Sequence, residues 1–112
     1  MSEVLAHTLF ALSDTNRLQM VELLKAGPLS VGEIASQLGL QQPQTSKHLK
    51  VLLQAGIVRI EPAANRRIYH LRTEPFQGLT AWSQSFEQQM VSRMTRLEGY
   101  LEQMQHTVDP KE

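Results

Sequence analysis

Apolar residues recur every three or four positions near the start of the chain, which is the spacing of an amphipathic helix. This spacing predicts a first helix over residues 3–12 and a second that begins after Asp14, a good N-cap, and ends at the Gly27-Pro28 pair. The apolar faces of the two helices are expected to consist of Leu5, Leu9 and Leu12, and of Leu18, Val21 and Leu24.

A helix, a turn and a basic helix follow over residues 31–56. Ser30 and Glu33 form a capping-box sequence, and Gly39 ends the first of these helices. Pro43 lies in the first turn of the second helix, which Gly56 closes. The predicted buried residues are Ile34, Ala35 and Leu38 in the first helix, and Thr45, Leu49, Leu52 and Leu53 in the second.

The opposite face of the second helix is polar and free of acidic residues. It is expected to consist of Gln44, Lys47 and His48, with Lys50 at its border. Such side chains suit contacts to base edges and phosphates in a major groove, although a solvated surface helix could have the same composition.

Residues 57–72 alternate between apolar and polar types, which predicts a two-stranded hairpin. Asn65 suits the turn because asparagine tolerates the left-handed backbone region. Arg66 and Arg67 therefore lie at or beside the hairpin tip, where they could contact a phosphate or a narrow minor groove. The order of elements predicts a mainly α fold with a small β-hairpin, namely a winged helix-turn-helix with about five helices and a two-stranded wing.

The segment from residue 75 to residue 106 predicts one long helix of roughly 45 Å, more than one small domain can cover. Either its apolar stripe folds back on its own domain, or it pairs with a second subunit together with residues 3–12; the second interpretation is favoured. The predicted dimerisation residues are Leu5, Leu9, Trp82, Phe86, Met90, Met94, Leu97, Leu101 and Met104.

The length of 112 residues predicts a single domain over residues 1–112, and the chain has no net charge. Its charges are nevertheless segregated, because residues 41–72 contain six basic residues and only one acidic residue, Glu61. The absence of cysteine excludes disulfides and agrees with a cytoplasmic location. The apolar run near the N-terminus is too short for a membrane span and lacks the basic flank of a signal peptide.

Motifs of known enzymes are missing from the sequence. It contains no glycine-rich phosphate loop, no H-E-x-x-H and no nucleophile elbow, so a non-enzymatic function is expected. The alternative to a DNA-binding regulator is a winged-helix module for protein interaction. Modules of that kind usually lose the basic residues of the second helix and the wing, and this chain retains them.

The sequence resembles the ArsR-type bacterial winged-helix repressors over about residues 4 to 104. The resemblance rests on three motifs, Asp14-x-x-Arg17-Leu18, Ser46-x-His48-Leu49-x-x-Leu52 and Ala55-Gly56-Ile57-Val58. It implies a homodimeric repressor that binds double-stranded DNA at a pseudo-palindromic operator, with autoregulation as one form of its control. The residues that would face DNA are Gln42, Gln44, Thr45, Ser46, Lys47, His48 and Lys50, with Arg66 and Arg67 in the wing. Gln41 and Asn65 depart from the usual N-cap serine and wing-tip glycine.

Many relatives of this type sense metals, but the residues predict neither a metal nor a cofactor here. Ser30, Gly32 and Glu33 stand where an arsenic-type sensor has a Cys-x-Cys-Asp sequence. On the last helix, His106 lies near Glu98 and Glu102, an arrangement more typical of solvated surface than of a zinc site, although an atypical metal-responsive site remains the alternative. The remaining histidines are expected in packing (His7), DNA contact or support (His48) and a strand surface (His70). The effector is unknown.

Overall fold

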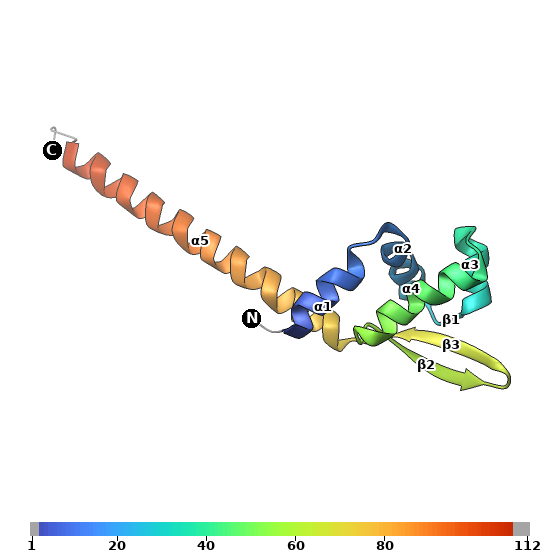
Figure 1. The fold of residues 1–112 in the computed structure, drawn as a ribbon. Helices are drawn as coiled ribbons and strands as arrows, with labels where there is room; N and C mark the ends of the chain where they lie inside the picture. The colour runs from blue at the N-terminus through green and yellow to red at the C-terminus, as the bar shows by residue number, and fades with distance from the viewer. Residues whose placement is uncertain (1–2, 109–112) are drawn as a thin grey trace. The chain divides into compact units, whose positions relative to one another are not determined.

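A computed structural model describes residues 3–108, and their side chains through residue 105. The elements are α1 (Glu3–Leu12), α2 (Thr15–Ala26), β1 (Leu29–Ser30), α3 (Val31–Leu38), α4 (Gln42–Gln54), β2 (Val58–Ala63), β3 (Arg66–Leu71) and α5 (Glu74–Val108) (Figure 1). These helices and strands confirm the predicted winged helix-turn-helix architecture. The chain divides into two compact units, one ending at Gly78 and one beginning at Leu79. None of the described helices combines the length and apolarity needed to cross a membrane.

The small sheet of the first unit has three antiparallel strands in the order β1-β3-β2. The hairpin of β2 and β3 is the predicted wing, in which Ile60 lies opposite Tyr69. The third strand was not predicted: β1 pairs Leu29 with Tyr69 and Ser30 with Ile68. Two residues are too few to show the alternation by which a strand is detected in a sequence.

The wing turn consists of residues 64 and 65, and its left-handed backbone belongs to Ala64 with φ of 56°. The expectation that Asn65 supplies this conformation is therefore wrong. The ladder closes between Ala63 and Arg66, which leaves a two-residue connection. The turn types favoured in two-residue hairpin connections have a positive φ at their first residue, and here that residue is an alanine.

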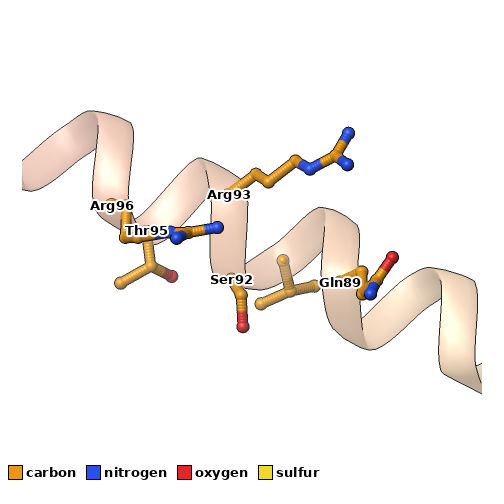
Figure 2. Close-up of a pocket in the computed structure, with 6 residues that line it drawn as sticks. Gln89, Ser92, Arg93, Thr95 and Arg96 are labelled. Carbon is orange, nitrogen blue, oxygen red and sulfur yellow. The ribbon is translucent and has the colours of Figure 1, made fainter.

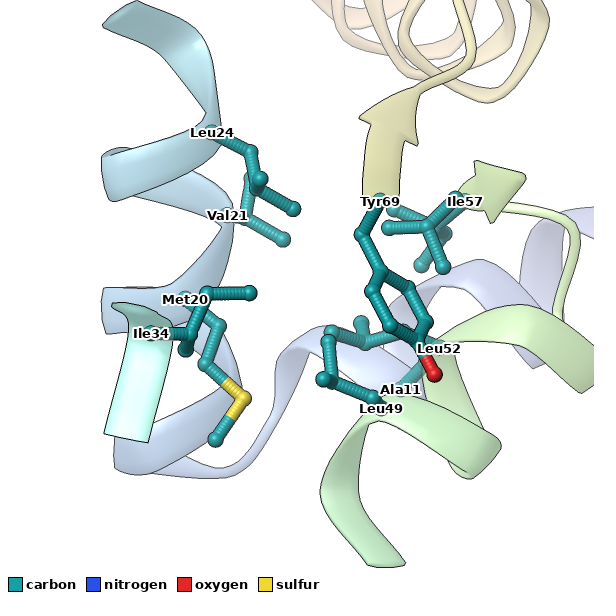
Figure 3. Close-up of a cluster of buried hydrophobic side chains, with 10 residues drawn as sticks. Ala11, Met20, Val21, Leu24, Ile34, Leu49, Leu52, Ile57 and Tyr69 are labelled. Atoms are coloured by element: carbon teal, nitrogen blue, oxygen red, sulfur yellow. The ribbon is translucent and has the colours of Figure 1, made fainter. Parts of the chain in front are cut away.

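The hydrophobic core lies between the helices of the first unit and the sheet (Figure 3). Its buried residues are Ala11, Met20, Val21, Leu24, Ile34, Leu49, Leu52, Ile57, Val58 and Tyr69. Leu18 was predicted to join them but is 47% exposed. The buried face of α2 instead runs through Arg17, Met20, Val21 and Leu24, which follow the i, i+3, i+4, i+7 spacing. Apolar spacing alone does not indicate that Arg17 takes a position on this buried face, because charged side chains are rarely buried.

The helix-turn-helix forms largely as its local sequence predicts. The Glu33 amide donates to Ser30 Oγ at 3.2 Å and the Ser30 amide to Glu33 Oε1 at 2.8 Å, which completes the capping box of α3. Gly39 ends this helix in the left-handed region with φ of 68°. Gln41 is the N-cap of α4 but makes no side-chain capping bond, so Pro43 is the main local signal for where α4 starts.

Candidate nucleic-acid interface

Helix α4 presents a polar surface to solvent from its first residue to its middle. Its sequence contains no acidic residue, so this surface is neutral or positive throughout. The exposed members of the predicted DNA-facing set are Gln42, Gln44, Ser46, Lys47 and Lys50. Long amide and ammonium side chains at this spacing can donate to base edges and to phosphate oxygens.

Thr45 was predicted to face DNA, and the structure shows that this prediction is wrong. Its side chain is fully buried, and its hydroxyl donates to the Gln41 carbonyl oxygen at 2.9 Å. Thr45 lies one helical turn before Leu49, on the face that packs into the core. A fully buried side chain cannot contact a base, so Thr45 supports α4 from within.

His48 lies on α4 in a half-buried position, with 17% of its side chain exposed. Its Nδ1 atom is 3.3 Å from Nη1 of Arg17 and 3.9 Å from Oδ1 of Asp14. Both neighbours lie at the start of α2. The predicted role as support for the interface therefore has a structural basis, and this contact joins α4 to α2.

Sequence reasoning singled out Arg17 only as part of a family motif and gave it no role. Its side chain is buried, and Nε donates to the Ala11 carbonyl oxygen at 2.6 Å. Asp14 caps the same helix by accepting from the Arg17 amide at 3.1 Å, and this hydrogen bond lowers the pKa of Asp14. The available signal was the position of Arg17 on the inward face of α2, together with Met20 and Leu24.

The two arginines beside the wing turn have different surroundings. Arg66 donates from Nη2 to Oε1 of Glu33 at 3.1 Å, which ties the wing to the first turn of α3. The Ser30 amide bound to the same carboxylate lowers the pKa of Glu33 and keeps it charged for this ion pair. Arg67 is exposed and lies opposite Pro62 in the ladder.

The other histidines of the first unit differ in exposure. His70 lies on β3, where a surface position was predicted, but it is half-buried, and its Nε2 is 2.6 Å from Oε1 of Glu61 on the neighbouring strand. His7 was expected to pack, but it is exposed on α1 in the single chain.

Helix α5 has the predicted apolar stripe, and in the second unit of the single chain this stripe is open to solvent. The exposed fractions are 52% for Phe86, 63% for Met90, 60% for Met94, 52% for Leu97, 51% for Leu101 and 60% for Met104. Trp82 is half-buried and meets Phe86 edge to face at 5.2 Å between ring centres. In the first unit, Leu9 is 39% exposed and Leu5 is half-buried.

The part of α5 in the second unit, which begins at Leu79, has a hollow on its surface that is open to solvent. Figure 2 shows a shallow hollow lined by Gln89, Arg93, Arg96 and their neighbours, all of which project from this one helix. Glu98 and Glu102 are exposed, and the side chain of His106 lies outside the described side chains. Over the part of the chain that the structure describes, no three potential metal ligands cluster.

The fold and the acid-free face of α4 define a winged helix-turn-helix protein, and comparison with known proteins identifies its family. Residues 14–59 match the model of the bacterial regulatory proteins of the arsR family. The transcriptional repressor SdpR of Bacillus subtilis is 32% identical over 76 residues, which cover 68% of this chain and 84% of SdpR. The chain belongs to the ArsR family, whose members are DNA-binding regulators rather than enzymes.

Two further relatives extend the comparison. The HTH-type transcriptional regulator Rv2034 of Mycobacterium tuberculosis is 49% identical over 61 residues, which cover 54% of this chain and 57% of that relative. Among solved structures, the homodimeric winged helix-turn-helix DNA-binding domain of Mb0332 from Mycobacterium bovis superposes with a TM-score of 0.64 at 26% identity. That match covers 81% of this chain and 84% of the solved one.

Proposed function

We propose that this chain acts in the cytoplasm as a homodimeric transcriptional repressor that binds an inverted-repeat operator. The single observation that carries the proposal is the exposed face of α4, which has Gln44, Lys47 and Lys50 and no acidic residue. In this arrangement α4 enters the major groove, and Arg67 in the wing contacts the flanking phosphates. The naming of SdpR as a repressor and of the Mb0332 domain as homodimeric supports both parts of the proposal.

A dimer has two copies of α4, so its symmetry determines the form of the operator. Two-fold related helices read two half-sites about one helical turn apart, roughly 34 to 36 Å. The open apolar stripe of α5, from Phe86 to Met104, is the surface on which the second subunit packs.

Selection of bound fragments from the source genome by the purified protein tests this proposal. We expect enrichment of one inverted repeat, with an affinity that falls by about 10³ to 10⁵ fold between about 50 and 200 mM salt if ~6 to 10 phosphates are contacted. A substitution of Arg67 by alanine should reduce this salt dependence. Lys25→Ala is the charge-matched control, because Lys25 pairs with Glu22 on α2 instead of lying on α4 or in the wing.

The competing function is a winged-helix module that binds another protein. That module would bind DNA weakly, with no enriched repeat and with equal effects of Arg67→Ala and Lys25→Ala. Either result would remove the support for a repressor.

A further inference from the structure

The buried guanidinium of Arg17 is a feature that DNA binding by α4 alone does not explain. Burying a charged group is costly unless hydrogen bonds compensate for its lost hydration. Here Nε donates to the Ala11 carbonyl oxygen at 2.6 Å and Nη2 to that of Phe10 at 3.4 Å. The guanidinium also lies 5.6 Å from the centre of the Phe10 ring. The side chain of Arg17, a residue of α2, thus caps the last turn of α1, where carbonyl groups lack partners within the helix.

The third nitrogen of the same guanidinium faces the proposed DNA-binding helix. Nη1 of Arg17 is 3.3 Å from Nδ1 of His48. Arginine is always a donor and never an acceptor, so this contact is a hydrogen bond only if Nδ1 of His48 has no proton. A neutral imidazole has one proton, which must then be on Nε2.

Asp14 is the other charged residue near this ring, and its geometry is consistent with the same tautomer. Its Oδ1 atom is 3.9 Å from Nδ1 of His48, beyond hydrogen-bond distance, and accepts from the Arg17 amide at 3.1 Å. The carboxylate therefore does not capture a proton on Nδ1 in this arrangement.

We propose that Arg17 is a positioning residue for sequence recognition: it holds His48 as the Nε2–H tautomer and so fixes one hydrogen-bond donor at the DNA surface. This inference rests on the proposed function, since it needs α4 in the major groove. There the donor meets the acceptors of base edges, such as guanine N7 and O6 or thymine O4. Because the same guanidinium binds Phe10 and Ala11, it also links the end of α1 to the helix that reads DNA.

Nitrogen NMR of the imidazole rings tests the tautomer without DNA. At about pH 8, where free imidazole is neutral, His48 should be found as the Nε2–H form in the full-length protein. Arg17→Met should convert it to a mixture of tautomers. His70 is the matched internal control, because its side chain is 20% exposed against 17% for His48 and its partner is Glu61. An Nδ1–H ring in the unaltered protein, or a tautomer that Arg17→Met leaves unchanged, overturns the proposal.

A double-mutant cycle tests whether Arg17 acts on DNA through His48. Arg17→Met and His48→Ala should each weaken the selected operator about tenfold relative to random DNA, and the double variant no more than either alone. His48→Gln should restore much of the preference, because its amide nitrogen can replace the Nε2 donor, and should make the operator less sensitive to Arg17→Met. Losses that multiply to about a hundredfold would mean that Arg17 only caps α1.

Folding is monitored by circular dichroism, and Arg17→Lys replaces Arg17→Met in the cycle if the latter unfolds. Lysine keeps the charge but lacks the planar guanidinium that donates to α1 and to His48 at the same time. In Arg17→Lys the His48 ring should therefore also become a mixture of tautomers. If the unaltered protein selects no DNA repeat while its His48 is the Nε2–H form, the proposed function fails and the recognition role fails with it. If it selects a repeat but the cycle is additive, only the role of Arg17 fails.

Discussion

Replacing Leu97 by aspartate is a direct test of the apolar stripe on α5. Leu97 lies midway along the open stripe and is 52% exposed in the single chain. The chain offers a matched control in Gln88, which is exposed on the opposite side of the same helix. Gln88→Asp introduces the same charge and a similar loss of helix propensity. The two variants therefore differ mainly in the face that receives the carboxylate.

The expected effect follows from the area that a second subunit would cover. Fully burying a leucine contributes about 1.5 to 3 kcal/mol, so covering the exposed half of Leu97 contributes ~1 kcal/mol per subunit. A carboxylate in its place loses this term and adds a desolvation cost of several kcal/mol. Two-fold symmetry doubles both contributions, to more than ~4 kcal/mol per dimer. The dissociation constant of the dimer should then rise about 10³ fold or more.

Sedimentation velocity over a concentration series measures this shift, and operator binding by the same samples gives a second readout. Leu97→Asp should sediment as a monomer where the unaltered protein and Gln88→Asp are dimers, and its operator affinity should fall because one monomer reads only one half-site. A Leu97→Asp protein that remains dimeric and binds the operator normally would show that subunits do not pack on this stripe.

Four further outcomes are expected. Gln44→Ala should weaken the operator more than random DNA in competition assays, whereas Arg67→Ala should weaken both alike, since phosphate contacts contain little sequence information. Leu52→Ala should lower the free energy of unfolding in urea by ~2 to 5 kcal/mol, because this side chain is fully buried. The hydrogen bond from the Ser30 amide lowers the pKa of Glu33 from 4.5, so the carboxylate stabilises the fold above pH 4.5, and this stabilisation is lost as the pH falls through the pKa of the folded state. Glu33→Gln should therefore lower the free energy of unfolding at neutral pH, and the difference from the unaltered protein should disappear in acid. Zinc titration should leave the operator complex intact, both in the unaltered protein and in His106→Ala.

Features encoded by neighbouring residues were predictable from the sequence. The capping box of Ser30 and Glu33 involves two residues three positions apart, and the structure has both of its hydrogen bonds. The wing likewise follows from a period of two over a few residues. In these cases the energetic preference is local, so the sequence contains the whole signal.

Features that depend on distant residues were not predictable in the same way. The contact between Arg17 and His48 joins residues 31 positions apart, and a charged side chain gives no sign in the sequence that it will be buried. Thr45 illustrates the limit of reasoning from a family resemblance. The helical spacing between Thr45 and Leu49 predicts that Thr45 is buried, whereas its place in the family motif predicts that it contacts DNA. The structure confirms the burial.

The two wing arginines are a further feature that depends on a distant residue. Because they are adjacent in the sequence, both were predicted to contact DNA in the same way. Arg66 is held by Glu33, 33 residues earlier, and the same carboxylate oxygen accepts the Ser30 amide. A phosphate that recruited Arg66 would have to compete with a carboxylate that the capping box already holds in place. Arg67 is exposed beside it and meets no such competition from this carboxylate. Arg66 is therefore expected to set the position of the wing against α3, and Arg67 to make the stronger phosphate contact.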